Sequence, residues 1–304
     1  MWTSLLDVLL DMDPGHDDAL ALLTALPLMR VLAVTAVAGN QTLDKTWLNA
    51  RRILWAAGSH IPVIPGHAKP LLRDLVTAAY VHGESGLDGY AFPTLPPPGE
   101  TPHATEYLAR VFAEWPRPIA WVATGPLTNV AAFLMDHPHL AHQIASLTLM
   151  GGSLSAGNIT AQAEFNIFVD PEAADYVMSS GLPIRMVGLD VTHKALLRRD
   201  DLDRFLTLRR PLGEMLFRLF SFYGRHEPDA GEKGIPIHDV LAVAALLHPE
   251  LFTWKTTAIR VGRGEDRDRG QTIPVMEGHP VDVAVDIKVS AFFDWMWNAL
   301  GAYR

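Results

Sequence analysis

The alternation of short apolar runs with helix-like segments constrains the possible fold of this chain more than any other feature of its sequence. The runs are mostly continuous and rich in valine, leucine and isoleucine: LLDVLL (5–10), VLAVTAVAG (31–39), IAWVATG (119–125), SLTLMGG (146–152) and IRMVGLDV (184–191). Segments typical of helices lie between them, at 17–26, 42–58, 106–115, 127–136 and 171–180. Continuous apolar strands are typical of parallel strands buried on both faces. We therefore predict an α/β fold with a mostly parallel, doubly wound open sheet and helices on both faces.

The last third of the chain predicts a different arrangement. Residues 198–248 are mainly helical in pattern, with a polar break at 224–234. Three strand-like segments and a helix-like segment at 290–301 then follow, the strands being TTAIRV (256–261), TIPVME (272–277) and VDVAVDIKV (281–289). These indicate a small C-terminal antiparallel addition to the sheet. No segment of the 304 residues is typical of a linker, so we predict a single domain over residues 1–304.

Composition excludes several classes of function. The net charge is −9 and no long basic run occurs, which argues against a nucleic-acid groove or an anionic membrane surface as a partner. The chain has no cysteine, so disulfides, thiol nucleophiles and cysteine-ligated metals are excluded. The first residues lack the basic start of a signal peptide, and no apolar run reaches the roughly 18 residues of a membrane span. We expect a cytoplasmic protein.

Four aspartates gather where the first apolar run should meet a helix: Asp11, Asp13, Asp17 and Asp18 in LLDMDPGHDDALALL (9–23). Helix capping explains Asp17 and Asp18, but it does not explain two carboxylates at the end of an apolar strand. An EF-hand loop starting at Asp11 would need glycine where His16 stands and glutamate where Leu22 stands. A phosphorylated-aspartate site would have to hold phosphate among four repelling carboxylates.

A hard cation with a hydroxyl-rich ligand fits the aspartates better, because calcium and magnesium prefer oxygen ligands. In open α/β sheets, ligands bind at the carboxyl ends of the strands. Polar groups do follow other predicted strands, at Asn40, at Thr124 and at Met150–Gly152, and a His238–Asp239 pair opens a helical run. We expect these residues to converge on the aspartates.

Seven motifs together resemble the nucleoside hydrolases, the inosine–uridine-preferring family. They are DMDPGHDDALAL (11–22), AVAGN (36–40), VHGESGLDG (81–89), ATGPLTNVA (123–131), LMGGS (149–153), GNITAQAEFNIFVDPEAA (157–174) and IHDVLAVA (237–244). Each is short, but their order and spacing extend over almost the whole chain. The resemblance implies a calcium-dependent enzyme that hydrolyses ribonucleosides to ribose and free base.

The resemblance also implies roles for individual residues. The calcium ligands would be Asp13, Asp18, the carbonyl of Thr124 and Asp239, and Asp13 would also be the base for a calcium-bound water. The residues around the nucleoside would be Asp17, Asn40, Glu164 and Asn166 at the ribose, Asn158 near its 5′-hydroxyl, and His82, Phe165 and Met150 along the base or sugar. Asp11 receives no such role, and we expect it to support neighbouring groups or to bond to backbone.

The chemistry of N-glycosidic cleavage agrees with these roles. Departure of the base leaves positive charge on the sugar, which carboxylates stabilise. Water that attacks the face opposite the base would invert the anomeric carbon, by analogy with inverting glycosidases. A poor leaving base also needs a proton, for which His238 is the first candidate, then His82, then His226 or Tyr223.

The preferred base is left open by the sequence. Tyr223 and His226 lie in the segment before IHD and are candidate base contacts. We favour uridine or cytidine, with purine preference or broad specificity as the alternative. A calcium-dependent nucleoside-binding protein is the non-enzymatic alternative, and the presence of Asp13 argues against it. The expected partners are a small ribonucleoside and further copies of the chain, as a homodimer or homotetramer.

Overall fold

The computed structural model describes residues 5–228, 230, 234–265 and 268–304. Its main sheet has the strand order β10-β9-β11-β6-β5-β4-β1-β2-β3. The parallel strands are β1 (Asp7–Met12), β2 (Arg30–Ala36), β3 (Val63–Pro65), β4 (Ile119–Ala123), β5 (Ile144–Met150), β6 (Ile184–Val187) and β11 (Pro280–Ile287). The antiparallel strands are β9 (Phe252–Val261), which pairs with β11, and β10 (Thr272–Val275). The predicted doubly wound sheet with an antiparallel C-terminal addition is confirmed.

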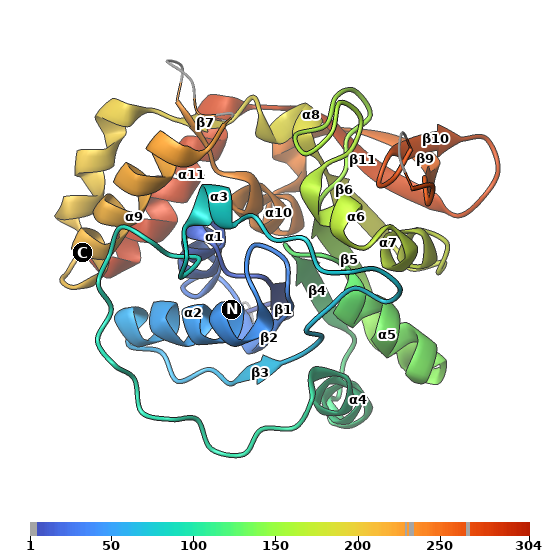
Figure 1. Ribbon diagram of the computed structural model, residues 1–304, viewed down its shortest axis with the longest axis horizontal. Coiled ribbons are helices and arrows are strands. Elements are labelled where there is room, and N and C mark those ends of the chain that lie inside the picture. The colour runs from blue at the N-terminus through green and yellow to red at the C-terminus, as the bar shows by residue number, and fades with distance from the viewer. Residues whose placement is uncertain (1–4, 229, 231–233, 266–267) are drawn as a thin grey trace.

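Helices cover both faces of this sheet (Figure 1). One face packs against α1 (His16–Ala25), α2 (Leu43–Ala57), α9 (Leu212–His226), α10 (His238–Leu247) and α11 (Val289–Leu300). The other packs against α4 (Ala104–Glu114), α5 (Thr128–Asp136) and α7 (Pro171–Met178). Strand β1 supplies both cores, since Val8, Leu10 and Met12 belong to the first apolar cluster and Leu9 to the second. This explains why its apolar run is continuous rather than alternating.

Shorter elements connect these layers. They are the helices α3 (Ala79–His82), α6 (Phe165–Val169) and α8 (Leu189–Thr192), the strand pair β7 (Leu196–Leu197) and β8 (Ile235–Pro236), and 3₁₀ turns at Pro138–Gln143, Arg199–Thr207, Pro249–Leu251 and Gly301–Tyr303. The predicted strand at 184–191 ends earlier, at Val187, because the chain turns at Gly188 into α8. Strand β3 has only three residues and was not predicted.

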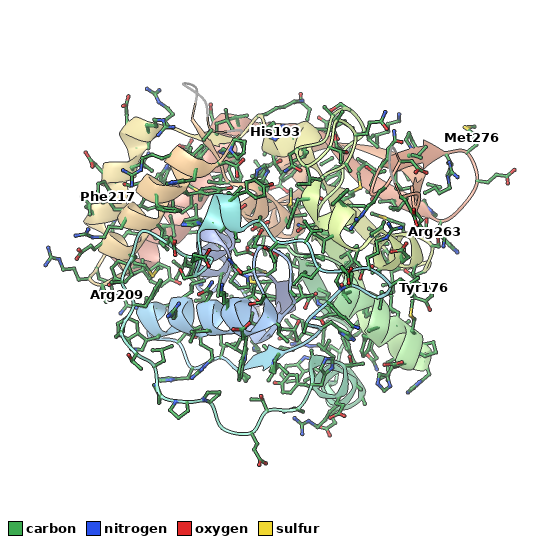
Figure 2. All side chains as sticks on the ribbon, viewed as in Figure 1. Tyr176, His193, Arg209, Phe217, Arg263 and Met276 are labelled. Atoms are coloured by element: carbon green, nitrogen blue, oxygen red, sulfur yellow. The ribbon has the colours of Figure 1, made fainter. Side chains whose placement is uncertain are left out.

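Side chains fill the space between the sheet and its helices (Figure 2). Met276, in the turn between β10 and β11, instead projects from the body and is fully exposed. Among the described residues, no helix is long and apolar enough to cross a membrane. The carboxyl ends of β1, β2, β4 and β5 lie along one edge of the sheet because these strands are parallel, and the candidate site is built there.

Candidate active site

The aspartate-rich turn links β1 to α1 at that edge. Asp13 follows the strand, and Asp17 and Asp18 lie in the first turn of α1. All three residues are buried, and Asp17, the most exposed of them, is 5% exposed. Gly15 allows the turn to approach a second loop closely, since a Cβ at this position would lie 2.6 Å from Cε1 of His82. Any side chain there would collide with that ring.

Asp239 joins this group from α10, as expected. Carboxylate oxygens of Asp17, Asp18 and Asp239 lie within 4.8 Å of one another and are all buried. Oδ1 of Asp18 accepts a hydrogen bond from Oγ1 of Thr124 at 2.7 Å, and Oδ2 accepts from N of Gly15 at 2.9 Å. The cluster therefore joins the ends of β1 and β4 to the start of α10.

Asp13 lies beside the cluster, and only one of its two carboxylate oxygens accepts a hydrogen bond in the described structure. Its Oδ2 accepts from N of Asn40 at 2.7 Å. Its Oδ1 is buried and has no hydrogen-bond partner within the described chain. Burying an anionic oxygen without a hydrogen-bond donor costs free energy. A hard cation bound by these carboxylate oxygens would remove that cost, so the residues present fit such an ion.

The electrostatics of the four carboxylates favour a cation in the same way. Burial raises the pKa of Asp13, Asp17, Asp18 and Asp239 above the usual range. Repulsion between neighbouring carboxylates raises the pKa of Asp13, Asp17 and Asp239 further. An opposite charge held among such groups stabilises their ionised forms.

Glu164 and Asn166 face the cluster from the loop and helix after β5. Glu164 caps α6 and accepts hydrogen bonds from N of Asn166, N of Ile167 and N of Gly152, at 2.9, 3.2 and 2.9 Å. Burial raises its pKa to about 7 despite these donors. Nδ2 of Asn166 donates to the carbonyl of Thr124 at 2.8 Å, which ties α6 to the end of β4.

Aromatic rings line the opposite side of the site. The buried ring of His82 lies 5.2 Å from that of His16 and 5.4 Å from that of Tyr223, stacked on both. The Nδ1 atoms of His16 and His82 are 3.0 Å apart. Burial lowers the pKa of His16 to about 4 and that of His82 well below its usual value.

His238 stands between α10 and α8. Its Nδ1 lies 2.8 Å from Oγ1 of Thr192, at the end of α8. His193 follows Thr192 in the chain and is labelled in Figure 2, and its ring is 5.6 Å from that of His238. The hydroxyl of Thr192 therefore orients the imidazole of His238. The first turn of α10, which carries His238, also presents Asp239 to the cluster.

One pocket brings most of the expected residues together. Its lining contains Asp17, Asn40, His82, Thr124, Met150, Asn158, Glu164, Phe165, Asn166, Tyr223, His238 and Asp239. Asp13 and Asp18 are completely buried beside it and do not line it. Asn158 is held at its edge by a hydrogen bond from N of Phe165 to Oδ1 at 3.0 Å.

His226 does not line this pocket. It is the exposed last residue of α9, with its ring stacked on Phe222 at 4.0 Å and its Nδ1 2.9 Å from the carbonyl of the same residue. The lining also includes Tyr80, Glu227 and Pro228, which sequence reasoning did not select. Tyr80 stands two residues before His82, and Glu227 follows His226 in the polar break. Their closeness in sequence to these candidate residues is the signal that could have identified them.

Asp11 lies behind the site. Its Oδ1 accepts hydrogen bonds from the hydroxyl of Thr35 and from Nδ2 of Asn129, the latter at 2.8 Å. Its own carbonyl accepts from N of Thr124 at 2.8 Å. Burial raises the pKa of Asp11 to about 7. The residue thus joins the ends of β1, β2 and β4, consistent with the supporting role expected for it.

Comparison with known proteins identifies the relatives of this chain. The family model described as inosine-uridine preferring nucleoside hydrolase matches residues 8–294. The pyrimidine-specific ribonucleoside hydrolase RihA of Citrobacter koseri is 44% identical over 98% of this chain and 99% of its own length. A purine-preferring ribonucleoside hydrolase from Gardnerella vaginalis superimposes with a TM-score of 0.91 at 29% identity, over 97% of this chain and 98% of its own. The plant nucleoside hydrolase PpNRh1 superimposes with a TM-score of 0.90 at 32% identity over the same shares.

Proposed function

This chain belongs to the inosine-uridine preferring nucleoside hydrolase family and is a ribonucleoside hydrolase, and we propose that the pocket at the carboxyl edge of its sheet is where the N-glycosidic bond is cleaved. The observation that carries this proposal is the buried group of Asp17, Asp18 and Asp239, of which Asp17 and Asp239 line that pocket. Asparagine and histidine side chains surround the carboxylates. This arrangement suits a cation together with a sugar diol.

Calcium is the cation we propose. Asp13, Asp18, the carbonyl of Thr124 and Asp239 would hold it, because all four offer oxygen atoms and calcium prefers oxygen. Asp17 lies close enough to belong to the same group of carboxylates. When bound, the ion would orient water and the ribose hydroxyls and would stabilise negative charge near the sugar.

Asp13 is the proposed general base. Its Oδ1 has no hydrogen-bond partner in the described structure and can accept a proton from the attacking water, while N of Asn40 holds its Oδ2. Carboxylates around the sugar stabilise the positive charge that develops as the base departs. Attack from the face opposite the base inverts the anomeric carbon.

The ribose would be bound by residues on both sides of the cluster. We assign its hydroxyls to Asp17, Asn40, Glu164 and Asn166, and its 5′-hydroxyl to Asn158. Their place in one pocket supports this assignment. Met150 and Phe165 border the sugar or the base with apolar surface.

The leaving base would meet His82, His238 and Tyr223. His238 is the first candidate for the proton donor, since Thr192 orients its ring beside Asp239, and His82 is the second. His226 does not line the pocket, so its contribution would require a movement of the end of α9. We propose a preference for uridine or cytidine, which the specificity named for the 44% identical relative supports. The 29% identical purine-preferring structure supports the alternative.

Release of ribose from a panel of nucleosides tests the proposal. Uridine, cytidine, inosine and adenosine should be compared with and without a chelator, followed by added calcium. Hydrolysis that stops in chelator and returns with calcium supports the site. Full activity in chelator, with no divalent ion found by metal analysis, would reject it.

We also propose that the chain assembles as a homodimer or homotetramer. An apolar groove lined by Trp47, Leu54, Trp55, Ile61 and Leu95 lies on the surface of α2 and the segments beside it, and Trp55 is 43% exposed. Such an exposed apolar surface is typical of an interface. Light scattering of the purified protein, compared with Trp55→Glu, measures the assembly directly.

A further inference from the structure

Asn49 connects two loops that both carry residues of the proposed site. This asparagine lies in α2 and is completely buried. Its Nδ2 donates hydrogen bonds to the carbonyl of Pro14 at 3.2 Å and to the carbonyl of Ser85 at 2.8 Å. Pro14 belongs to the aspartate turn, and Ser85 belongs to the loop that follows His82. One amide group therefore holds both loops to one helix.

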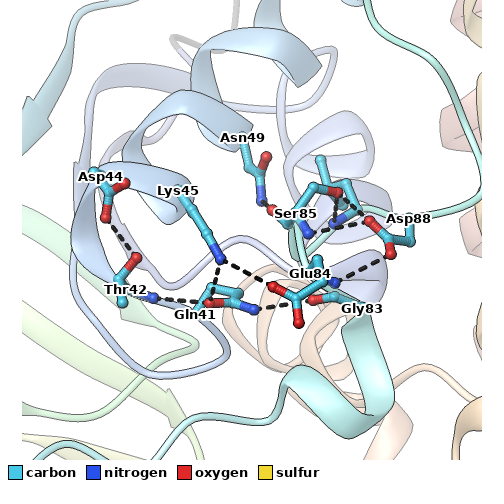
Figure 3. Close-up of polar contacts among 10 residues, drawn as sticks. Gln41, Thr42, Asp44, Lys45, Asn49, Gly83, Glu84, Ser85 and Asp88 are labelled. Carbon is cyan, nitrogen blue, oxygen red and sulfur yellow. Dashed lines mark hydrogen bonds and ion pairs between the residues drawn. The ribbon is translucent and has the colours of Figure 1, made fainter.

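The loop after His82, residues 83–88, is internally braced. The carboxylate of Asp88 accepts hydrogen bonds from N of Glu84, N of Ser85 and Oγ of Ser85, at 3.1, 3.1 and 2.5 Å. Figure 3 shows these hydrogen bonds, together with the side chains of α2 and of the segment before α2 that face the loop. N of Asp88 also donates to the carbonyl of His82 at 3.3 Å, so hydrogen bonds through Asp88 connect Ser85 to His82.

The approach of Asn49 to this loop depends on Gly86. This glycine has a φ of +80°, and a Cβ there would lie 2.8 Å from Nδ2 of Asn49. Most residues avoid this backbone region, and a side chain would also push the asparagine away. The loop is shaped to receive the amide.

Other contacts also hold the loop. His16, which lies between Asp13 and Asp17, donates from its backbone N to Nδ1 of His82 at 3.3 Å, and its Nε2 lies 2.9 Å from the carbonyl of Asp88. Nε2 of Gln41 donates to the carbonyl of Gly83 at 2.9 Å but does not contact the aspartate turn. Lys45 lies 3.8 Å from the carboxylate of Glu84, whose side chain is 95% exposed, and an exposed ion pair of this kind contributes little. Figure 3 shows both side chains beside Asn49.

We propose that Asn49 is a positioning residue, which sets the place of His82 relative to the aspartate turn that holds Asp13 and Asp18. The inference rests on the proposed function, in which His82 meets the leaving base. Helix α2 packs against the core and serves as the fixed frame. Without Asn49 the two carbonyl groups would lack their buried donor, and both loops would lose their common attachment to α2. The contacts of His16 with His82 and with the carbonyl of Asp88 would remain between them, but these do not fix either loop to that helix.

The test uses Asn49→Asp and Asn49→Ala. The aspartate keeps the size of the side chain but replaces the donor by an acceptor that faces two carbonyl oxygens. The alanine removes the donor without that repulsion, and it decides the question if the aspartate variant does not fold. Lys45→Met is the matched control, because it alters the same helix and faces the same loop without touching Asn49 or Pro14.

The kcat/KM values for uridine and p-nitrophenyl riboside provide the readout. A displaced His82 should impair the poor leaving group and spare the activated one, which needs no proton. We expect the ratio of uridine to p-nitrophenyl riboside to fall by about tenfold or more, since a misplacement near 1 Å can cost about 100-fold. Calorimetric titration with calcium alone should show affinity within about twofold of the wild type if the aspartate ligands stay in place.

An unchanged ratio in Asn49→Ala would overturn the inference, as would a loss of calcium affinity with both substrates reduced equally. A similar fall of the ratio in Lys45→Met would also overturn it. A wild type that hydrolyses neither substrate would instead refute the proposed function, so the two failures are distinguishable.

Discussion

Replacement of Glu164 by glutamine should change how the stability of this protein depends on pH. Glu164 is 2% exposed, and burial raises the pKa of its carboxyl group from 4.5 to about 7. Three backbone N–H groups, of Gly152, Asn166 and Ile167, oppose this shift by favouring the ionised form. The folded protein therefore holds a proton at Glu164 over a pH range in which the unfolded chain has lost it.

The sign of the effect follows from that difference. Between about pH 4.5 and about pH 7 the folded state binds one more proton than the unfolded state, so the free energy of unfolding falls as pH rises. The contribution is fully present below the unfolded pKa and is lost as pH rises through the folded pKa. Each pH unit corresponds to about 1.4 kcal/mol, so the full change is on the order of 3 kcal/mol.

Urea unfolding of the wild type and of Glu164→Gln, from about pH 4.5 to about pH 8 in chelator, measures this change. The buried aspartates titrate in both proteins and cancel in the comparison. The variant should lose the Glu164 component, so its unfolding free energy should fall less steeply with pH. Parallel curves would refute the reasoning and would mean that the three N–H donors fully offset the effect of burial on the pKa of Glu164.

Three further predictions concern the proposed chemistry. Asp18→Ala should weaken calcium binding and turnover together because a hard cation loses an anionic ligand; calorimetry and ribose release measure both, and unchanged calcium affinity would remove Asp18 from the ligand set. Asp13→Ala should lower kcat by a factor of roughly 10²–10⁴, the scale of a lost general base, and a kcat equal to that of the wild type would exclude Asp13 from that role. His238→Ala should reduce uridine hydrolysis far more than hydrolysis of p-nitrophenyl riboside, with His142→Ala, an exposed histidine outside the pocket, as the control that changes neither. Equal losses on both substrates would reject His238 as the proton donor.

Several features of the fold could be predicted because they depend on local pattern. Buried parallel strands require continuous apolar runs, and these identified β1, β2, β4, β5 and β6. The turn after β1 identified the aspartates, because charge at the end of a buried strand needs a compensating partner. The distances between the motifs identified the family, which the comparison confirms.

Other features depended on packing between distant segments. Asp239 reaches Asp17 and Asp18 only because α10 packs beside α1. Tyr223 and His226 are three residues apart on α9, yet Tyr223 is 1% exposed and lines the pocket while His226 lies outside it. The orientation of that helix on the core decides this difference, and the sequence of the helix does not state it.

Asn49 illustrates the same division. In the sequence it is one polar residue on a helix that also contains Lys45 and Arg52, with nothing to distinguish it. In the structure its amide meets carbonyl groups 35 and 36 residues away in sequence. Residue chemistry and the order of strands and helices are local properties, so the sequence by itself determined the class of fold and the type of site. Which side chains meet is set by long-range packing, and only the tertiary structure decided that.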